Sequence, residues 1–200
     1  MLLTKRLVDI ILSLLGMLFF VPLLPIIGLL IKLDSRGPVF YFAPRVGKGM
    51  KLFKMFKFRT MLETPVRVGE CLCPQFDPRV TGFGHILRRT KINELPQLIN
   101  ILKGDMSFVG PRPEAPELAD MYPDDAKIVF SVKPGLVGPA SIKLRNEEEC
   151  YPIGVDAKKY YVENLLPSKV RMDREYILNP SLSNYMKFIF FGVTMTITGI

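Results

Sequence analysis

The sequence predicts a mainly helical α+β fold: a re-entrant membrane hairpin of the helix–break–helix type, then a small cytosolic domain with interfacial amphipathic helices and short β pieces. Three observations support this prediction. Residues 10–31 form a run of 22 residues without a charge, interrupted by two prolines. Residues 38–61 hold two short β-like runs, the second of which mixes apolar and basic side chains in near alternation. Helical patterns dominate the rest of the chain.

The composition limits the class of protein. The length of 200 residues suits one small domain with appendages. With 48% hydrophobic residues the chain is too apolar to be disordered and unusually apolar for a soluble domain. Three cysteines are too few for a disulfide scaffold, and the single histidine, His85, argues against a Cys/His zinc site.

The uncharged run is long enough to cross a bilayer, since a helix of that length extends roughly 33 Å. Pro22 and Pro25 lie near its middle, and each disfavours helical geometry in the residue before it. Basic residues flank both ends: Lys5, Arg6, Lys32 and Arg36. A re-entrant hairpin over 1–36 keeps both pairs on the cytoplasmic side, as the positive-inside bias favours. A kinked span remains the alternative.

The positive charge is also local. Residues 32–112 hold 15 Lys and Arg against 6 Asp and Glu, a net charge of +9, whereas residues 113–200 carry −2. This basic segment directly follows the membrane hairpin, so it could adhere to anionic lipid or hold a phosphorylated substrate. No nucleic-acid partner is expected, because neither a stacking-aromatic motif nor a basic recognition helix is present.

The cytosolic domain is expected to span 37–187. Residues 38–61 read as two short strands around a Gly-Lys-Gly turn, and 63–80, with three prolines, as a loop. The predicted helices cover 83–90, 93–104 with Asn93 as N-cap, 114–132 with a break near Pro123, and 156–178. Residues 104–113 read as a rigid irregular loop, and the apolar segment 188–200 as a membrane-interface segment.

One stretch concentrates chemistry-bearing residues. A helix beginning at Asn93 and Glu94 would present free N–H groups to a phosphate. The guanidinium groups of Arg88 and Arg112 match phosphate oxygens in a bidentate manner. A neighbouring carboxylate could hold Mg²⁺, which prefers oxygen ligands and substrate phosphates. The residues alone therefore indicate a membrane-associated protein that handles phosphates.

A series of motifs spans the chain in order. It comprises Lys5-Arg6-Leu7-Val8-Asp9, Lys57-Phe58-Arg59-Thr60-Met61, Asp77-Pro78-Arg79-Val80-Thr81, Leu87-Arg88-Arg89, Glu94-Leu95-Pro96-Gln97-Leu98, Lys103-Gly104-Asp105-Met106-Ser107, Val109-Gly110-Pro111-Arg112-Pro113 and Pro134-Gly135. These motifs resemble the bacterial sugar transferase family. At this length the chain looks like a small monotopic phosphoglycosyl transferase.

The resemblance implies a reaction. Family members move a sugar 1-phosphate from a nucleotide diphosphate sugar, often a UDP-sugar, to polyprenyl phosphate, commonly undecaprenyl phosphate, and release UMP. They need Mg²⁺ and form a covalent phosphosugar intermediate on an Asp that is followed by Glu. This is the first membrane step of bacterial glycoconjugate assembly. The resemblance also implies a monotopic protein on the cytoplasmic face of the inner membrane, and a homodimer is an open expectation.

The sequence departs from the family at the Asp-Glu pair, which reads Asn93-Glu94 here. An amide lacks the anionic oxygen of a carboxylate nucleophile and is a weaker Mg²⁺ ligand. Four explanations stay open: Glu94 takes the covalent role, the transfer is direct, the position was altered to trap the protein, or catalysis was lost. We expect Asn93 and Glu94 to be the catalytic and metal-binding positions. The alternative is a non-catalytic relative that binds a nucleotide sugar or a partner enzyme.

The expected substrate-binding residues are basic: Lys57, Arg59, Arg88, Arg112 and Arg145. For each of them the alternative is a structural role without substrate contact. Surface arginines are commonly solvated, and Lys57 and Arg59 alternate with core aromatics and could lie on the solvated face of a strand. Asp9 is expected to pair with Lys5 or Arg6, since an unpaired charge is costly in a membrane. Asp105 shapes a turn, His85 is structural, and Cys71 and Cys73 are ordinary loop residues.

Overall fold

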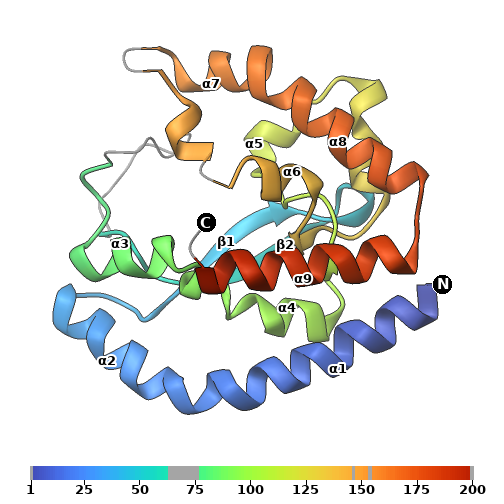
Figure 1. Ribbon diagram of the computed structural model, residues 1–200. Coiled ribbons are helices and arrows are strands. Elements are labelled where there is room, and N and C mark those ends of the chain that lie inside the picture. The colour runs from blue at the N-terminus through green and yellow to red at the C-terminus, as the bar shows by residue number, and fades with distance from the viewer. Residues whose placement is uncertain (1, 63–76, 146, 153–154, 199–200) are drawn as a thin grey trace.

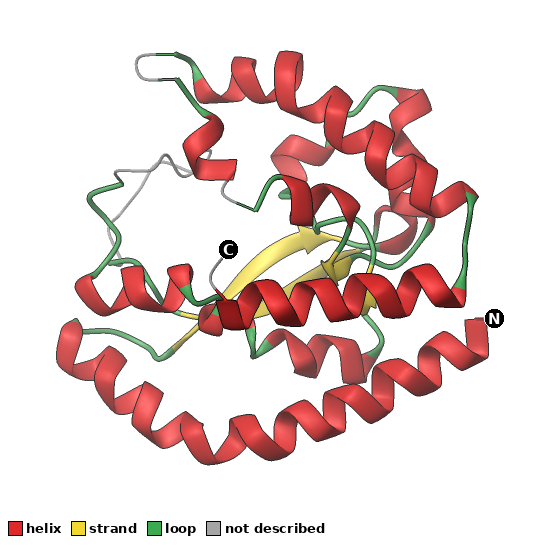
Figure 2. Cartoon of the chain, viewed as in Figure 1, coloured by secondary structure: helices red, strands yellow, loops and turns green. Residues whose placement is uncertain are grey.

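A computed structural model describes residues 2–62, 77–145, 147–152 and 155–198 and is mainly helical, with two small sheets (Figures 1 and 2). The helices are α1 (Leu2–Phe20), α2 (Leu24–Asp34), α3 (Gly82–Arg89), α4 (Gln97–Lys103), α5 (Pro116–Ala119), α6 (Pro139–Lys143), α7 (Ala157–Tyr160), α8 (Leu166–Leu178) and α9 (Leu182–Thr198). The strands are β1 (Phe40–Val46), β2 (Leu52–Phe58), β3 (Ser107–Val109) and β4 (Gly135–Val137). Figure 1 shows α1 and α2 along one side of the molecule and α7 and α8 along the opposite side.

The predicted helix–break–helix is present at the N-terminus. A 3₁₀ turn, Val21–Leu23, separates α1 from α2, with Pro22 in the turn and Pro25 in the first turn of α2. Both prolines therefore occupy positions that need no helical N–H donor. The two helices meet at a wide bend (Figure 1). The stretch Leu3–Asp34 is long and apolar enough to cross a membrane, judged by length and composition alone.

Residues 1–36 do not form a detached unit. Phe20, Ile27 and Ile31 are buried, and they pack against Phe58 of β2 and Leu87 of α3. The opposite face of the same two helices is exposed and apolar: Leu14, Leu18, Phe19, Ile26, Leu29 and Leu33. The N-terminal segment is thus part of the core on one side and an apolar surface on the other.

Asp9 does not form the expected ion pair with Lys5 or Arg6. Its buried carboxylate accepts hydrogen bonds from the Ser107 hydroxyl (3.0 Å), the Phe108 N–H (3.0 Å) and the Tyr185 hydroxyl. Arg6 instead donates to two carbonyls at the C-terminal end of α4, where the helix dipole attracts a cation. The sequence pattern missed these partners because they come from β3 and α9.

The two sheets are small. β1 and β2 pair antiparallel from Phe40 opposite Phe58 to Val46 opposite Leu52, and the turn between them contains Gly49 at φ +66°, which confirms the predicted hairpin. β3 pairs parallel with β4, so the predicted loop 104–113 contains a strand. A side chain on Gly135 would lie 2.1 Å from the Gly110 nitrogen, so this crossing requires glycine.

The helix expected over 93–104 begins later. Lys91, at φ +58°, ends the preceding turn in the left-handed region, and Asn93 lies in a 3₁₀ turn, Ile92–Glu94. α4 proper starts at Gln97 after Pro96 and ends before Gly104, at φ +90°, as predicted. Asn93 is therefore not the N-cap of α4, whereas α3 matches its predicted range closely.

The helix expected over 156–178 is present but interrupted. Asp156 caps it by accepting from the N–H groups of Lys158 and Lys159. A π-helical turn, Tyr161–Leu165, separates α7 from α8 just before Pro167. Because Pro167 lacks an N–H and its ring clashes with the preceding turn, the register shifts there.

Two further boundaries differ from expectation. α9 begins at Leu182, so the predicted boundary at residues 187/188 falls within a helix, and α9 packs on β3, β4 and α6. The acidic segment forms α5 and a 3₁₀ helix, Asp124–Ser131, and the predicted break at Pro123 is confirmed. Most of the predicted loop 63–80, including Cys71 and Cys73, lies outside the described residues.

Candidate active site

A cavity of about 580 Å³ lies between α1, the β1–β2 hairpin, α3, α4, α6, α8 and α9. Its volume is in the range of small-molecule sites, about 300–1,000 Å³. Charged side chains line it and most are basic: Arg45, Lys57, Arg88, Lys91, Glu94, Arg112, Glu114, Arg145, Glu147 and Lys169. Four of the five predicted substrate-binding residues are in this lining. The excess of cations makes the cavity suited to an anion.

Three residues form what we call the Glu94 cluster: Lys57, Glu94 and Arg112. The Glu94 Oε1 atom accepts from Lys57 Nζ at 2.8 Å and from Arg112 Nη2 at 3.0 Å. Lys57 projects from β2, Glu94 from the 3₁₀ turn before α4, and Arg112 from the segment after β3. Three elements far apart in the sequence therefore converge on one carboxylate.

The cluster shifts the protonation of its members. Burial disfavours ionisation of Glu94, but Lys57 and Arg112 outweigh it and hold the pKa of the carboxyl well below its usual range. Burial lowers the pKa of Lys57 to about 8, and Glu94 only partly opposes this. Glu94 raises the pKa of Arg112. At neutral pH all three groups are charged, with a net charge of +1.

Asn93 lies beside this cluster. The residue is buried, and within the described part of the chain its Oδ1 atom accepts no hydrogen bond. Buried polar atoms nearly always have a partner, and one without a partner points to a missing ligand or water. Glu94 lines the cavity, whereas Asn93 is buried behind it and is not among the residues that line it.

The other predicted residues fall in two groups. Arg88 of α3 and Arg145 line the cavity, and Arg145 donates to the Met195 carbonyl of α9. Arg59 lies elsewhere: its buried guanidinium donates to carbonyl oxygens of Ser35, Arg36 and Pro38 and to the Ser35 hydroxyl. Arg59 therefore fixes the segment between α2 and β1 and is not among the cavity-lining residues.

A second group, which we call the Glu114 cluster, was not predicted. Glu114 Oε1 accepts from Lys169 Nζ (2.8 Å), the Tyr161 hydroxyl (2.8 Å) and the Tyr122 hydroxyl (3.1 Å). Lys169 also donates to Glu147 at 3.2 Å. Tyr161 begins the π-helical turn and Lys169 follows it on α8, so the shifted register aims both at Glu114. Nothing in the sequence pattern distinguishes these residues from an ordinary amphipathic helix.

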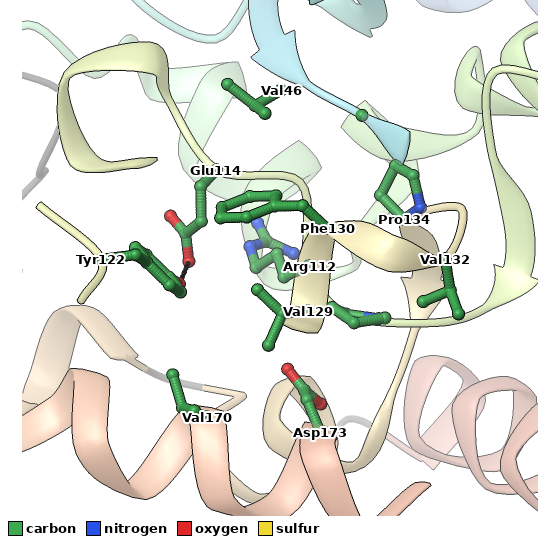
Figure 3. A pocket seen from close by; sticks show the side chains of 12 residues that line it. Val46, Arg112, Glu114, Tyr122, Val129, Phe130, Val132, Pro134, Val170 and Asp173 are labelled. Carbon is green, nitrogen blue, oxygen red and sulfur yellow. Dashed lines mark hydrogen bonds between the residues drawn. The ribbon is translucent and has the colours of Figure 1, made fainter. Parts of the chain in front are cut away.

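Figure 3 shows this region from close by. Glu114 and Tyr122 turn toward each other, and Asp173 rises from α8 on the far side of Val129. Asp173 is buried, accepts from the Ala140 N–H at 3.3 Å, and burial raises its pKa to about 7. The small space between these side chains holds only about 10 Å³, about the size of one water, so it is not a substrate site.

The donor set bears on a metal ion. Among the described residues no group of three His, Cys, Asp or Glu side chains could hold one. Mg²⁺ is commonly bound by one or two carboxylates together with substrate phosphates. Asn93 and Glu94 supply one amide oxygen and one carboxylate, so they fit Mg²⁺ only in company with phosphate oxygens.

Chemically, the cavity can bind a phosphorylated ligand on its cations and offers one carboxylate beside it. Lys57 and Arg112 each have further N–H donors that could turn to a phosphate. Glu94 would then lose its ion pairs and face the phosphorus as an anionic oxygen. This arrangement is suited to phosphoryl-group chemistry, in which positioning and charge stabilisation dominate.

Comparison with known proteins gives a consistent result. Residues 1–199 match the family model described as bacterial sugar transferase. A UDP-N-acetylgalactosamine-undecaprenyl-phosphate N-acetylgalactosaminephosphotransferase of Aeromonas hydrophila is 37% identical over 167 residues, 80% of this chain and 39% of that protein. An undecaprenyl-phosphate glucose phosphotransferase of Komagataeibacter xylinus is 37% identical over 198 residues, 96% of this chain and 35% of that protein.

A third relative has a similar length. The exopolysaccharide production protein PSS of Rhizobium leguminosarum bv. phaseoli is 37% identical over 206 residues, 97% of this chain and 95% of that protein. The chain therefore spans little more than a third of the first two relatives and nearly all of the third.

Proposed function

Because the chain belongs to the bacterial sugar transferase family, we propose that it transfers a sugar 1-phosphate from a UDP-sugar to undecaprenyl phosphate and releases UMP. The observation that carries this proposal is the Glu94 cluster at the wall of a cationic cavity. Both substrates are anionic and repel each other. The cations that line the cavity offset this repulsion and allow both substrates to bind in one site. The product would enter exopolysaccharide synthesis, as the relatives' names indicate.

The cations of the cluster act first. The diphosphate of the UDP-sugar takes the donors of Lys57 and Arg112, with Arg88 from α3 as a further contact. Glu94, released from its ion pairs, attacks the phosphorus next to the sugar. The bond from that phosphorus to the UMP oxygen breaks, and UMP leaves with the electron pair. A phosphate oxygen of the acceptor then attacks the same phosphorus, and the Glu94 carboxylate is regenerated.

Asn93 and Glu94 are the residues that would hold Mg²⁺ together with phosphate oxygens. When bound, the ion would supply positive charge to the substrate phosphates. The chain's own contribution is two consecutive residues of one 3₁₀ turn, one with an amide oxygen and one with a carboxylate.

A second candidate is a member of the family that binds a nucleotide sugar without turning it over. The specific observation in its favour is Asn93, a neutral amide where the family has a carboxylate. An amide cannot form the phosphosugar intermediate, so a protein in which Glu94 does not act as the nucleophile would bind the nucleotide sugar without this route to turnover.

One assay separates these candidates. UMP release is measured with several UDP-sugars, with and without undecaprenyl phosphate, for this protein and for Asn93→Asp. We expect acceptor-dependent UMP release from this protein and a phosphosugar adduct on Glu94 by mass spectrometry. Turnover by Asn93→Asp alone, with no turnover by this protein, would refute the proposed activity and support the binding role.

The protein would act at the cytoplasmic face of the inner membrane as a monotopic protein. The apolar outer face of α1 and α2 supports this, with Lys5 and Arg6 before it and Lys32 and Arg36 after it. If the segment re-enters, cysteines introduced at residues 3 and 36 should both react with a maleimide reagent from the cytoplasmic side. Labelling from opposite sides would establish the kinked span. The homodimer stays a prediction.

A further inference from the structure

The cavity that contains the Glu94 cluster is also lined by aliphatic and aromatic side chains from other elements. We call this part of the lining the apolar chamber: Leu12, Leu98, Phe108, Leu136, Val137, Ile142, Ile189 and Val193. The elements that carry them contact one another, α1 with α4 and β3, and α9 with β3, β4 and α6. The apolar residues therefore form one continuous wall.

Two glycines let the helices of this wall pack closely. A Cβ atom on Gly16 of α1 would lie 2.9 Å from a Leu98 methyl carbon, and one on Gly192 of α9 would lie 2.9 Å from a Val137 methyl carbon. Both glycines also line the cavity. The wall is thus made of α1, the helix with the exposed apolar face, and α9, at the opposite end of the chain.

The chamber reaches the surface along α9. Val193 lines the cavity and yet is 52% exposed. A long apolar chain seated in the chamber could therefore leave the protein beside α9. Val193 is apolar, so a hydrocarbon chain leaving beside it could continue into lipid.

We propose that the apolar chamber binds the first isoprene units of a polyprenyl phosphate, with the phosphate of that ligand at the Glu94 cluster. The proposal rests on the proposed function and deepens it, since it assigns the acceptor's hydrocarbon to a specific wall. The ligand has an anionic head on a branched hydrocarbon, and one cavity offers both the cations of the Glu94 cluster and the apolar chamber.

The other parts of the substrates fit the apolar chamber poorly. A uracil base or a sugar ring carries polar groups that lose free energy when buried without partners. On the elements that form the chamber, the described lining residues with hydrogen-bonding side chains are Gln97 and Ser141. Arg145 reaches the same wall, where it donates to the Met195 carbonyl of α9. The chamber therefore favours hydrocarbon. The nucleotide and the sugar are better suited to the part of the cavity that the charged residues line.

The test measures binding and needs no turnover. Full-length protein in lipid nanodiscs is titrated with farnesyl phosphate, which has three isoprene units, and with inorganic phosphate. We expect farnesyl phosphate to bind at least about tenfold more tightly, because each buried methylene contributes about 0.8 kcal/mol. Ile189→Trp, which fills the chamber, should weaken farnesyl phosphate about tenfold and leave inorganic phosphate unchanged.

The matched control is the next position on α9. Phe190→Trp enlarges a side chain on the exposed face and should leave both affinities unchanged. If Ile189→Trp also lowers the affinity for inorganic phosphate, the substitution has disturbed the fold. The test is then repeated on α1, with Leu12→Trp in the chamber and Ile11→Trp on the exposed face as its control. Equal affinities for the two ligands, or equal losses in both members of the deciding pair, would overturn the proposal.

The outcomes for the chamber and for the proposed activity are separable. Suppose that farnesyl phosphate binds more tightly than inorganic phosphate, that Ile189→Trp abolishes this difference, and that no UDP-sugar gives UMP release. This result would support the proposed binding chamber and refute the proposed transfer activity. UMP release with an acceptor KM that Ile189→Trp leaves unchanged refutes the chamber and supports the transfer.

Discussion

Glu94 and Glu114 are both buried glutamates in the wall of one cavity, and both are ion-paired to a lysine at 2.8 Å, but their partners differ. Lys169 uses its ammonium group fully, on Glu114, Glu147 and Tyr161. Lys57 donates, among the described residues, to Glu94 alone. A saturated ion pair can only hold the fold together, whereas an unsaturated one can exchange its partner for a ligand.

The sharpest way to break this contrast is to remove Lys169. Lys169→Met leaves Glu114 charged and buried without its cation, and should lower the free energy of unfolding by about 3–5 kcal/mol. Denaturant unfolding measures the change. The double variant with Glu114→Gln should recover part of the loss, because the uncompensated charge is then gone. A change under about 1 kcal/mol would mean that the Glu114 cluster is not structural.

The matching experiment on the other cluster targets Arg112. Arg112→Ala should weaken UDP-sugar binding about 100-fold, since it removes charge-assisted hydrogen bonds to the diphosphate. Its midpoint of unfolding should fall less than that of Lys169→Met, because Lys57 still neutralises Glu94. Arg171→Ala, an exposed arginine on α8, is the control and should change neither quantity. An unchanged affinity in Arg112→Ala would remove the cluster from the binding site.

Asp173 is a third buried carboxylate, and unlike Glu94 and Glu114 it accepts, from the residues that the structure describes, a single long hydrogen bond, from the Ala140 N–H at 3.3 Å. Its folded pKa of about 7 exceeds its unfolded value, so the folded protein binds the extra proton between roughly pH 4 and 7 and loses stability as the pH rises through that window. Asp173→Asn should therefore be stabilising, by about 2 kcal/mol more at pH 8 than at pH 5. Equal effects at both pH values would show that Asp173 does not titrate between pH 5 and pH 8 in the folded protein.

The smallest expected effect concerns Lys57. With a pKa of about 8, its ammonium loses charge as the pH rises from 7 to 9, so UDP-sugar affinity should fall a few-fold over that range. Lys57→Arg keeps the charge and should abolish the inflection. Binding titrations at pH 7, 8 and 9 compare the two proteins. A persistent inflection in Lys57→Arg would assign it to another group.

The sequence predicted the elements that depend on local pattern. The Pro22 break, the strand hairpin over 38–61, the helix at 83–90 and the stop at Gly104 all follow from proline, glycine and side-chain periodicity, and the structure confirms them. These features need only a few neighbouring residues. The site residues Lys57, Glu94 and Arg112 were also predicted, through motifs of the family, and the structure brings them together.

What the sequence missed depends on contacts between distant segments. The short parallel pairing of β3 with β4 and the Glu114 cluster each join segments more than 20 residues apart. Arg59 was misplaced for a similar reason: it alternates with core aromatics as Lys57 does, but its side chain meets the carbonyls after α2. Periodicity identifies the face of a strand but not the partner on that face.

The hydrogen bond between Tyr185 and Asp9 joins residues 176 positions apart, which has a consequence for biosynthesis. The ribosome completes α1 long before it synthesises Tyr185. If α1 were buried at that stage, the Asp9 carboxylate would lack one of its hydrogen-bond donors, which is unfavourable. We expect α1 to stay loosely seated, or outside the lipid, until the end of translation. Nascent chains truncated before α9 should therefore associate with membranes less firmly than the complete chain does.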